Sequence, residues 1–189
     1  MSAFSESLHA FLKELDESLP SKKPLKLYLI GGSAITLAYD DENRTADLDF
    51  IDPPDFLVEK AGPKSVLAHK YRIHASSVAE INLSVPKDWR NQCRKLPLGL
   101  RKLEIWVPTV EDIVLGKLAR LEPKDFEDII GLRDLKRLDL PRLVKRLDEN
   151  RDELKHAEYR NNVKLMFREV FERTVYFEKG KIRLERIRG

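Results

Sequence analysis

The chain has 189 residues, of which 42% are hydrophobic and 35% are charged, and its formal net charge at pH 7 is +3. This composition predicts one compact domain with a helical appendage, and it excludes a strongly basic nucleic-acid-binding body. Cys93 is the single cysteine, which excludes an intrachain disulfide, and no apolar run approaches the ~20 residues of a membrane span. We therefore expect a cytoplasmic protein with no membrane partner.

Apolar periodicity predicts three elements at the start of the chain. Residues 3–18 carry apolar side chains at helical spacing, and residues 25–30 form an apolar run that is typical of a buried strand. Residues 45–51 alternate between apolar and polar side chains. This alternation predicts a second strand with one polar face.

The turn after the first predicted strand has the composition of a phosphate-binding turn. Gly31 and Gly32 permit a tight turn and a close approach of the backbone to a ligand. Ser33 is expected to cap a short helix over residues 34–39, and the start of a helix favours an anion. Because such turns are also common without a phosphate, this turn is a candidate site only in combination with a further motif.

Two carboxylates lie on the polar face of the second predicted strand. Asp47 and Asp49 are two residues apart, so their side chains point to the same side. Neighbouring negative charges destabilise a strand, and a cation between them removes that cost. Oxygen ligands of this kind suit Mg²⁺ (or Mn²⁺), although a solvated strand edge is the commoner reason for Asp-x-Asp alone.

The Gly-Gly-Ser turn followed by Asp-x-Asp on the next strand resembles the signature of the nucleotidyltransferase superfamily, which has a DNA polymerase β-like fold. The chain is most similar to small bacterial abortive-infection and toxin–antitoxin nucleotidyltransferases, including a nucleotidyltransferase-like family of unknown function. The resemblance implies an α+β fold, with a mixed β-sheet flanked by helices and followed by a C-terminal helical half. It also implies that Asp47 and Asp49 bind metal, and that Gly31, Gly32 and Ser33 bind nucleotide.

A lysine followed by a second acidic motif extends the resemblance. Those relatives carry a similar helix with a lysine followed by Lys-Asp-x-x-Asp, and here Lys117 precedes Lys-Asp-Phe-Glu-Asp at residues 124–128. We expect Lys117 to bind the nucleotide phosphates and to act in catalysis, with Asp125 and Asp128 as supporting residues. The alternative is that Lys117 only extends from a helix edge into solvent.

A third carboxylate, which the superfamily often has on a later strand, has two candidates. Glu80 lies in residues 78–85, which alternate as a strand with a polar face. Glu104 shares a face with Trp106 in the strand predicted over residues 103–107. The more polar surroundings favour Glu80 as a metal ligand and catalytic residue, and an exposed glutamate without a site role is the alternative for both.

Turn residues and helix caps delimit the remaining predicted elements. A helix over residues 55–70 is interrupted or bent near Gly62-Pro63, Thr109 can cap a helix, and Pro141 fits the first turn of a helix that Asp139 caps. The other predictions are a short strand at 71–74, helical or irregular chain at 89–96, and helices at 109–121, 124–136 and 141–174.

The resemblance implies three segments of chain and one reaction. The segments are a nucleotidyltransferase-like core with an N-terminal helix at 1–108, a helical half at 109–174, and a basic tail or edge strand at 175–189. The reaction is the metal-dependent transfer of an NMP from an NTP such as ATP to a hydroxyl of an RNA end (such as tRNA) or of a protein. Its biological setting would be toxin–antitoxin or phage defence, with a cognate antitoxin as a further partner.

Two other functional classes remain open. The first is a catalytically degenerate protein that acts as a binding module. The second is a nucleotidyltransferase that modifies a small molecule such as an antibiotic, which would need an acidic pocket. The basic segment at residues 175–189 weakly disfavours the second class.

Overall fold

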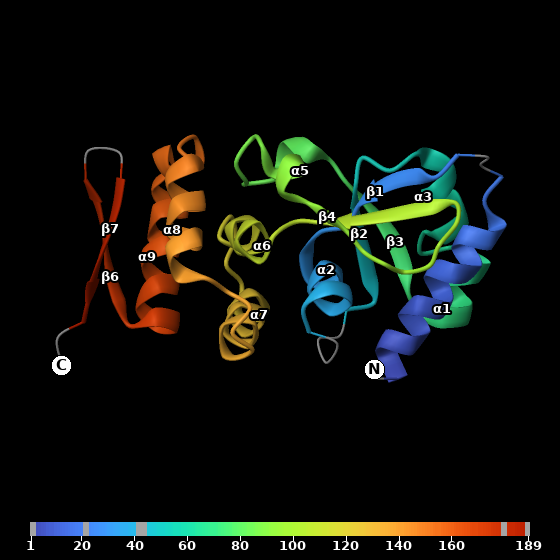
Figure 1. The fold of residues 1–189 in the computed structure, drawn as a ribbon, viewed down its shortest axis with the longest axis horizontal. Coiled ribbons are helices and arrows are strands. Elements are labelled where there is room, and N and C mark those ends of the chain that lie inside the picture. Colours follow the sequence, from blue (N-terminus) through green and yellow to red (C-terminus); the bar gives the residue numbers. More distant parts are fainter. Residues whose placement is uncertain (1–2, 21–22, 41–44, 179–180, 188–189) are drawn as a thin grey trace. The chain divides into compact units, whose positions relative to one another are not determined.

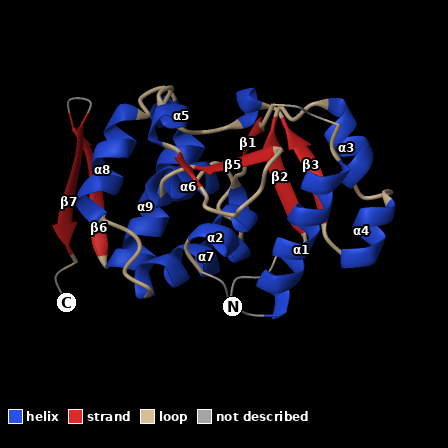
Figure 2. Ribbon diagram, turned by 45° about the vertical axis from the view of Figure 1, so that its right-hand side comes forward, coloured by secondary structure: helices blue, strands red, loops and turns tan. Residues whose placement is uncertain are grey.

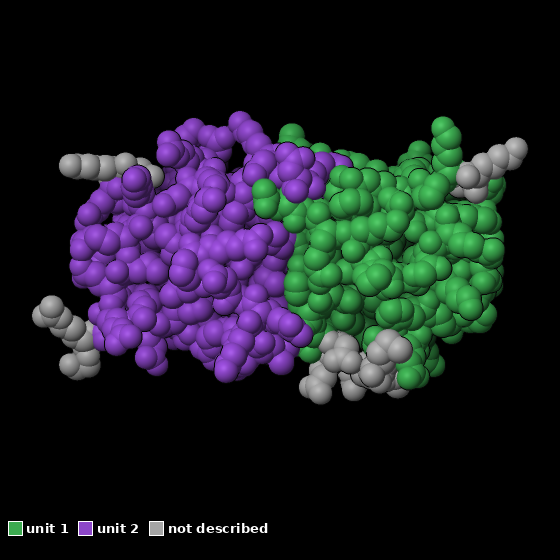
Figure 3. All heavy atoms as spheres, in the orientation of Figure 1, with its two compact units in different colours: residues 1–82, 92–108 green, residues 83–91, 109–189 purple. Residues whose placement is uncertain are grey.

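The chain folds into two compact units of mixed α and β structure, which confirms the predicted α+β class. Unit 1 comprises residues 1–82 and 92–108, and unit 2 comprises residues 83–91 and 109–189 (Figure 3). The structure is a computed structural model, and it describes the chain except for residues 1–2, 21–22, 41–44, 179–180 and 188–189.

Unit 1 contains the elements that carry the glycine turn and the two aspartates. They are α1 (Ala3–Ser18), β1 (Leu25–Tyr28), α2 (Gly31–Ala38), β2 (Asp47–Ile51), α3 (Asp55–Ala61), α4 (Val66–Tyr71), β3 (His74–Val78), η1 (Glu80–Asn82), β4 (Arg94–Lys95) and β5 (Leu103–Val107). Unit 2 is mainly helical. Its elements are α6 (Val110–Lys117), α7 (Pro123–Asp134), α8 (Leu140–Glu149), η2 (Glu153–Lys155), α9 (Ala157–Phe171), β6 (Arg173–Glu178) and β7 (Lys181–Arg186), and α5 (Trp89–Gln92) lies at the boundary between the units.

The strands of unit 1 form two small sheets that are joined edge to edge. In one sheet β1 pairs with β5 in parallel and β4 pairs with β5 in antiparallel, and in the other β2 pairs with β3 in parallel (Figure 1). Just after β1, Leu29 forms an antiparallel bridge with Phe50, and the Ile30 N–H donates to the Asp49 carbonyl oxygen at 2.9 Å. These contacts make one mixed strand layer with the order β4-β5-β1-β2-β3.

The two faces of this strand layer differ in polarity. Leu27, Leu29, Leu48, Phe50 and Ile105 are at most 2% exposed and form the core face. Apolar side chains of α1 are also buried, namely Leu8, Phe11, Leu12 and Leu15. Because side chains alternate along a strand, the residues between these core positions lie on the opposite face, and they are polar or aromatic.

Unit 2 packs a hairpin onto two helices. Leu143 and Leu147 of α8 and Phe167 of α9 are fully buried. The β6–β7 hairpin contacts both helices (Figure 2), and the Ile182 N–H donates to Asp148 Oδ1 at 2.8 Å. Within the part of the chain that the structure describes, no helix has the length and apolar character needed to cross a membrane.

Several predicted elements are confirmed at their expected positions. The predicted helix over 3–18 and the strand over 103–107 are present, and the helix break near Gly62-Pro63 separates α3 from α4. The Thr109 side chain accepts from the Asp112 N–H, and Asp139 caps α8 by accepting from the Arg142 N–H. These caps could be predicted from the sequence because each is a short polar side chain directly before a run with apolar residues at helical spacing.

Four element predictions were wrong. The short strand expected over 71–74 is found at His74–Val78 instead, after α4 ends at Tyr71. The strand expected over 78–85 is absent, because the second parallel strand ends at Val78 and Ile81, which should have faced the core, is 92% exposed. The helix expected over 34–39 begins at Gly31. The helix expected over 141–174 is two helices, α8 and α9, and β6 begins at Arg173.

Candidate functional site

The turn between β1 and α2 places backbone directly against a carboxylate. Gly31 has a φ of +67°, a conformation that glycine adopts without strain. A Cβ at this position would lie 3.2 Å from Asp49 Oδ2, and a Cβ at Gly32 would lie 3.4 Å from the Thr45 Cβ. The missing side chain at Gly31 therefore leaves room beside the Asp49 carboxylate.

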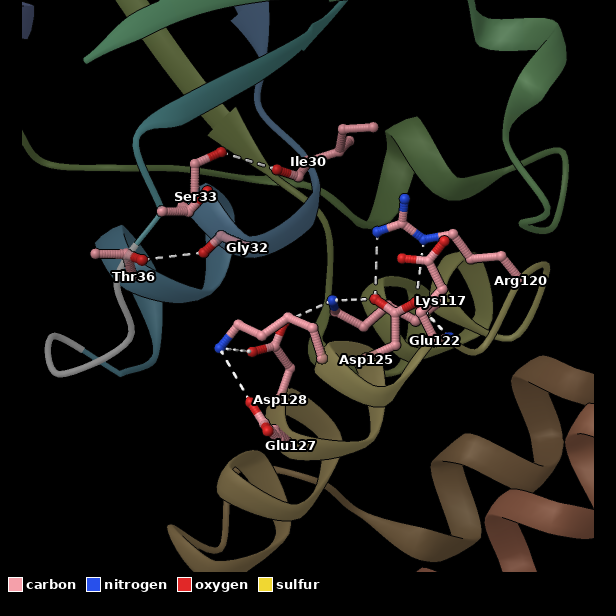
Figure 4. Close-up of polar contacts among 12 residues, drawn as sticks. Ile30, Gly32, Ser33, Thr36, Lys117, Arg120, Glu122, Asp125, Glu127 and Asp128 are labelled. Carbon is pink, nitrogen blue, oxygen red and sulfur yellow. Dashed lines mark hydrogen bonds and ion pairs between the residues drawn. The ribbon is translucent and has the colours of Figure 1, made fainter. Parts of the chain in front are cut away.

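Ser33 lies inside the first turn of α2 and does not cap the helix. The N-cap residue is Ile30, which makes no side-chain capping bond, and Ser33 Oγ donates to the Ile30 carbonyl oxygen at 3.0 Å (Figure 4). The Ser33 side chain is fully buried. The predicted cap was wrong because α2 starts two residues before Ser33. The groups at this turn that have no acceptor within the helix are the backbone N–H groups of Gly31, Gly32 and Ser33.

The two aspartates of β2 lie on the polar face of the strand layer, next to β3. Asp47 pairs in register with His74, and Asp49 pairs with Ser76. Ser76 Oγ donates to Asp47 Oδ1 at 2.6 Å, and His74 Nε2 lies 3.3 Å from the same oxygen. The Asp47 side chain is 44% exposed. Strand β3 therefore orients the Asp47 carboxylate while leaving it open to solvent.

Neither candidate for a third carboxylate lies on a strand beside the aspartate pair. Glu80 is in η1, and its N–H donates to Asp52 Oδ2 at 3.3 Å. Glu104 is on β5, where it forms an ion pair with Lys95 at 2.6 Å. The hydrogen bond from Lys95 lowers the pKa of the Glu104 carboxyl.

The sheet register separates Glu104 further from the pair. Glu104 lies opposite Lys26 of β1, and Asp49 contacts Ile30, which follows the end of β1. Ile30 is four residues after Lys26, which corresponds to roughly 13 Å of extended chain. Among the residues that the structure describes, no group of three or more His, Cys, Asp or Glu side chains is arranged to hold a metal. The role of Glu80 as a third metal ligand stays a prediction, but the strand on which that prediction was based is absent.

The oxygen donors of the pair would nevertheless suit a magnesium ion bound through two carboxylates. Magnesium in enzymes is commonly bound by one or two carboxylates, with substrate phosphates and water as the other ligands. Asp47 and Asp49 supply such oxygens, Ser76 fixes one of them, and the bare Gly31 leaves space at the other. Ligating carboxylates are usually oriented by such hydrogen bonds.

A second cluster, in unit 2, is built around Lys117. Its Nζ donates to Asp125 Oδ1 at 2.8 Å and to Asp128 Oδ2 at 2.6 Å, and Lys117 is 7% exposed (Figure 4). Asp125 also accepts from Arg120 Nε at 3.0 Å. The predicted contact between Lys117 and Asp128 is confirmed, and the alternative of a lysine extending into solvent was wrong.

The Lys117 cluster favours the charged form of the Asp125 carboxyl. Burial alone would raise the pKa of the Asp125 carboxyl, but hydrogen bonds from Lys117 and Arg120 outweigh burial and lower that pKa. Asp128 is 4% exposed and also pairs with Lys124 at 3.1 Å. Lys117 belongs to unit 2 and the aspartate pair to unit 1, so a site that they share stays a prediction.

Sequence reasoning missed three polar residues next to the predicted ones. His74 and Ser76 repeat the two-residue spacing of Asp47 and Asp49 on the following strand, and this spacing was a usable signal. Arg120 follows Lys117 by three residues, the spacing of neighbours on one helix face. The signal from His74 and Ser76 lay outside the motifs that carried the resemblance, whereas Arg120 lies between Lys117 and the second acidic motif.

Comparison with known proteins identifies a family model that covers most of the chain. No curated protein and no solved structure matches the sequence significantly. A family model matches residues 6–177, a range that includes the glycine turn, the aspartate pair and the Lys117 cluster. The chain therefore belongs to the family described as a nucleotidyltransferase of unknown function (DUF6036).

Proposed function

We propose that this protein is a metal-dependent nucleotidyltransferase that moves an NMP from an NTP to a hydroxyl acceptor. The observation that carries the proposal is the position of the Gly31 turn beside the Asp49 carboxylate. Gly31 has no side chain, and a Cβ placed on it would lie 3.2 Å from Asp49 Oδ2. A phosphate bound at this turn would meet backbone N–H groups and a carboxylate-held metal at the same time.

Each part of unit 1 has a defined task in this proposal. Asp47 and Asp49 hold Mg²⁺ or Mn²⁺, and Ser76 keeps Asp47 in its binding orientation. The backbone N–H groups of Gly31 and Gly32 bind the terminal phosphates, in place of the Ser33 hydroxyl, which donates to Ile30. The bound metal would stabilise the charge on the entering and leaving oxygens.

The proposed reaction is an in-line displacement at the α-phosphorus. The acceptor hydroxyl oxygen forms a bond to this phosphorus, the bond to the oxygen bridging to the β-phosphate breaks, and pyrophosphate leaves. The hydroxyl proton passes to solvent.

One observation favours a degenerate binding protein as the second candidate. Within the described ranges no third carboxylate completes a metal-holding cluster with the aspartate pair. A protein of this kind would bind an NTP, or a partner such as a cognate antitoxin, without transferring nucleotide. Its NTP affinity would be measurable by calorimetry while its transfer rate stayed at background.

The test is a labelling experiment with two positions of the label. The protein is incubated with Mg²⁺, a cell extract and each of the four NTPs, labelled either at the α- or at the γ-phosphate. We expect an α-labelled RNA or protein species and no γ-labelled one. Transfer of the γ-label would indicate a phosphotransferase, and the absence of any protein-dependent label would favour the degenerate protein.

A further inference from the structure

Two aromatic side chains lie next to each other on the polar face of unit 1. Tyr28 of β1 pairs in register with Trp106 of β5, so the two side chains point to the same side of the strand layer. Tyr28 and Trp106 each follow a core residue of their strand, because Leu27 and Ile105 are at most 2% exposed. Tyr28 and Trp106 are half-buried and therefore present aromatic surface on the face that also carries Asp47 and Asp49.

A lysine places a positive charge over this aromatic pair. Lys26 Nζ lies 3.9 Å from the centroid of the Trp106 ring and 4.9 Å from that of the Tyr28 ring. Lys26 is exposed. Aromatic rings together with cations are the combination that binds single-stranded nucleic acids, because bases stack on the rings and phosphates meet the cations.

The sheet register places the aromatic pair close to the aspartates. Asp49 contacts Ile30, which is two residues beyond Tyr28 on the same chain. Two residues along a strand and one strand across correspond to roughly 7 Å and 5 Å. A nucleic-acid strand whose end lies at the aspartate pair can therefore reach Tyr28 and Trp106.

We propose that Tyr28, Trp106 and Lys26 bind an unpaired nucleotide of an RNA acceptor. Its base displaces Lys26 Nζ from the ring faces and stacks there, and the displaced ammonium pairs with its backbone phosphate. The proposal rests on the proposed function and names the acceptor of that same site.

The position of Lys26 favours an acceptor strand over the NTP as the occupant. The phosphates of the NTP are assigned to the Gly31–Gly32 turn and the aspartate pair. Lys26 is four residues before Ile30, which is roughly 13 Å along the strand. It therefore marks the place of an additional phosphate, which a polynucleotide has and a free NTP lacks.

The chain contains its own fluorescent reporter for this site. It has two tryptophans, and Trp89, which is 3% exposed, is not part of the aromatic pair. The variant Trp89→Phe leaves Trp106 as the only tryptophan. We would titrate this variant with a short single-stranded RNA, without NTP or divalent metal, and record the tryptophan emission.

We expect saturable quenching of Trp106 by the RNA. Replacing Tyr28→Leu in the same background should weaken binding roughly tenfold or more, since a stacked base is lost. Lys26→Met should weaken binding and reduce its dependence on salt, because one phosphate contact is lost. Tyr176→Leu is the matched control, because Tyr176 is an exposed aromatic residue with Arg183 stacked at 4.7 Å, and it lies on β6.

Three outcomes would overturn the inference. They are the absence of quenching by RNA, quenching by free NTP at lower concentration than by RNA, and equal RNA binding by Trp89→Phe with and without Lys26→Met. Because the titration needs neither metal nor transfer, a negative transfer assay would contradict the proposed function without touching this result. Conversely, α-label on a protein alone would contradict this inference and support the proposed function.

Discussion

Gly31 is the residue at which the backbone conformation and the geometry of the site depend on each other. Its φ of +67° is strained for a residue with an L side chain, and an added Cβ would crowd Asp49 Oδ2. Gly99 has a similar φ of +69° but no atom within 4 Å of its Cβ position. These two glycines therefore separate the cost of backbone strain from the effect on the carboxylate.

We predict that Gly31→Ala and Gly99→Ala each lose about 1 kcal/mol of unfolding free energy, because both require a left-handed backbone. Only Gly31→Ala should also weaken Mn²⁺ binding, because its methyl group displaces the Asp49 carboxylate. Chemical denaturation and calorimetric titration with Mn²⁺ measure the two effects. Equal Mn²⁺ affinity of the two variants would show that Gly31 has only a conformational role.

Ser76 and Ser77 offer a second matched pair on one strand. Ser76 donates to Asp47 Oδ1, and Ser77 pairs in register with Phe50, so it points to the other side of the strand. We predict that Ser76→Ala raises the Mn²⁺ dissociation constant roughly tenfold or more, as is typical when a partner of a metal ligand is removed. Ser77→Ala should leave the constant unchanged, and a similar loss in both variants would contradict the role of Ser76.

At the scale of elements, the ion pairs between the end of α6 and the start of α7 join those two helices. Lys117 was predicted to have Asp125 and Asp128 as supporting residues, and its Nζ donates to both carboxylates. Asp125 is fully buried, and Asp128 nearly so. Removal of the Lys117 charge would leave both carboxylates with fewer partners in a buried environment.

We therefore predict that Lys117→Met lowers the unfolding free energy by about 3 kcal/mol, since breaking a buried ion pair strands the partner charge. Lys124→Met should cost less than about 1 kcal/mol, because its side chain is 57% exposed. Denaturation by urea measures both. A loss below 1 kcal/mol for Lys117→Met would contradict a structural role of this cluster.

The same cluster predicts a pH dependence with a defined sign. The pKa of Asp125 is lowered in the folded state, so its contribution to stability is present above the unfolded pKa of about 3.9 and is lost as the pH falls through the folded value. The decrease in stability on acidification below about pH 4 should therefore be smaller in Lys117→Met than in the wild type.

Arg146 of α8 joins segment 83–91 to unit 2. Its guanidinium donates to Asp112 Oδ1 at 2.8 Å and to Asp88 Oδ1 at 2.9 Å, and its side chain is 5% exposed. Burial alone would lower the pKa of Arg146, but the hydrogen bonds to Asp112, Asp88 and Glu149 raise it. These ion pairs explain why segment 83–91 belongs to unit 2, although residues 92–108, which follow it in the sequence, belong to unit 1.

We predict that Arg146→Met costs about 3–5 kcal/mol, because Asp112 is left buried without its cation. Combining it with Asp112→Leu should recover part of that loss, since an apolar pair replaces the stranded charge. Arg142→Met on the same helix is the control, as its side chain is 49% exposed. Thermal denaturation of the four proteins tests the prediction, and a double variant less stable than Arg146→Met would contradict it.

For the whole molecule, the sequence predicted the features that local patterns determine. Periodicity and caps located α1, β5 and the start of α8, and the order of the glycine turn and Asp-x-Asp pointed to the family that the chain belongs to. Glu80 was wrongly placed on a strand because Ile81 contributes to an apolar–polar alternation in the sequence. In the structure Ile81 is exposed and not part of a strand. Segment 83–91 could not be assigned, because its partners Arg146 and Asn150 are about 60 residues away and no local pattern links them.

The most direct test of the central claim is the transfer of α-labelled NMP by the double variant Asp47→Asn, Asp49→Asn. The variant removes two negative charges from one strand face, so we expect its thermal stability to equal or slightly exceed that of the wild type. Asp55→Asn is the control, because Asp55 is an exposed acid in the first turn of α3. We predict metal-dependent transfer by the wild type and by Asp55→Asn, and none by the double variant. Transfer by the double variant at the wild-type rate would contradict the assignment of this pair as the metal-binding centre.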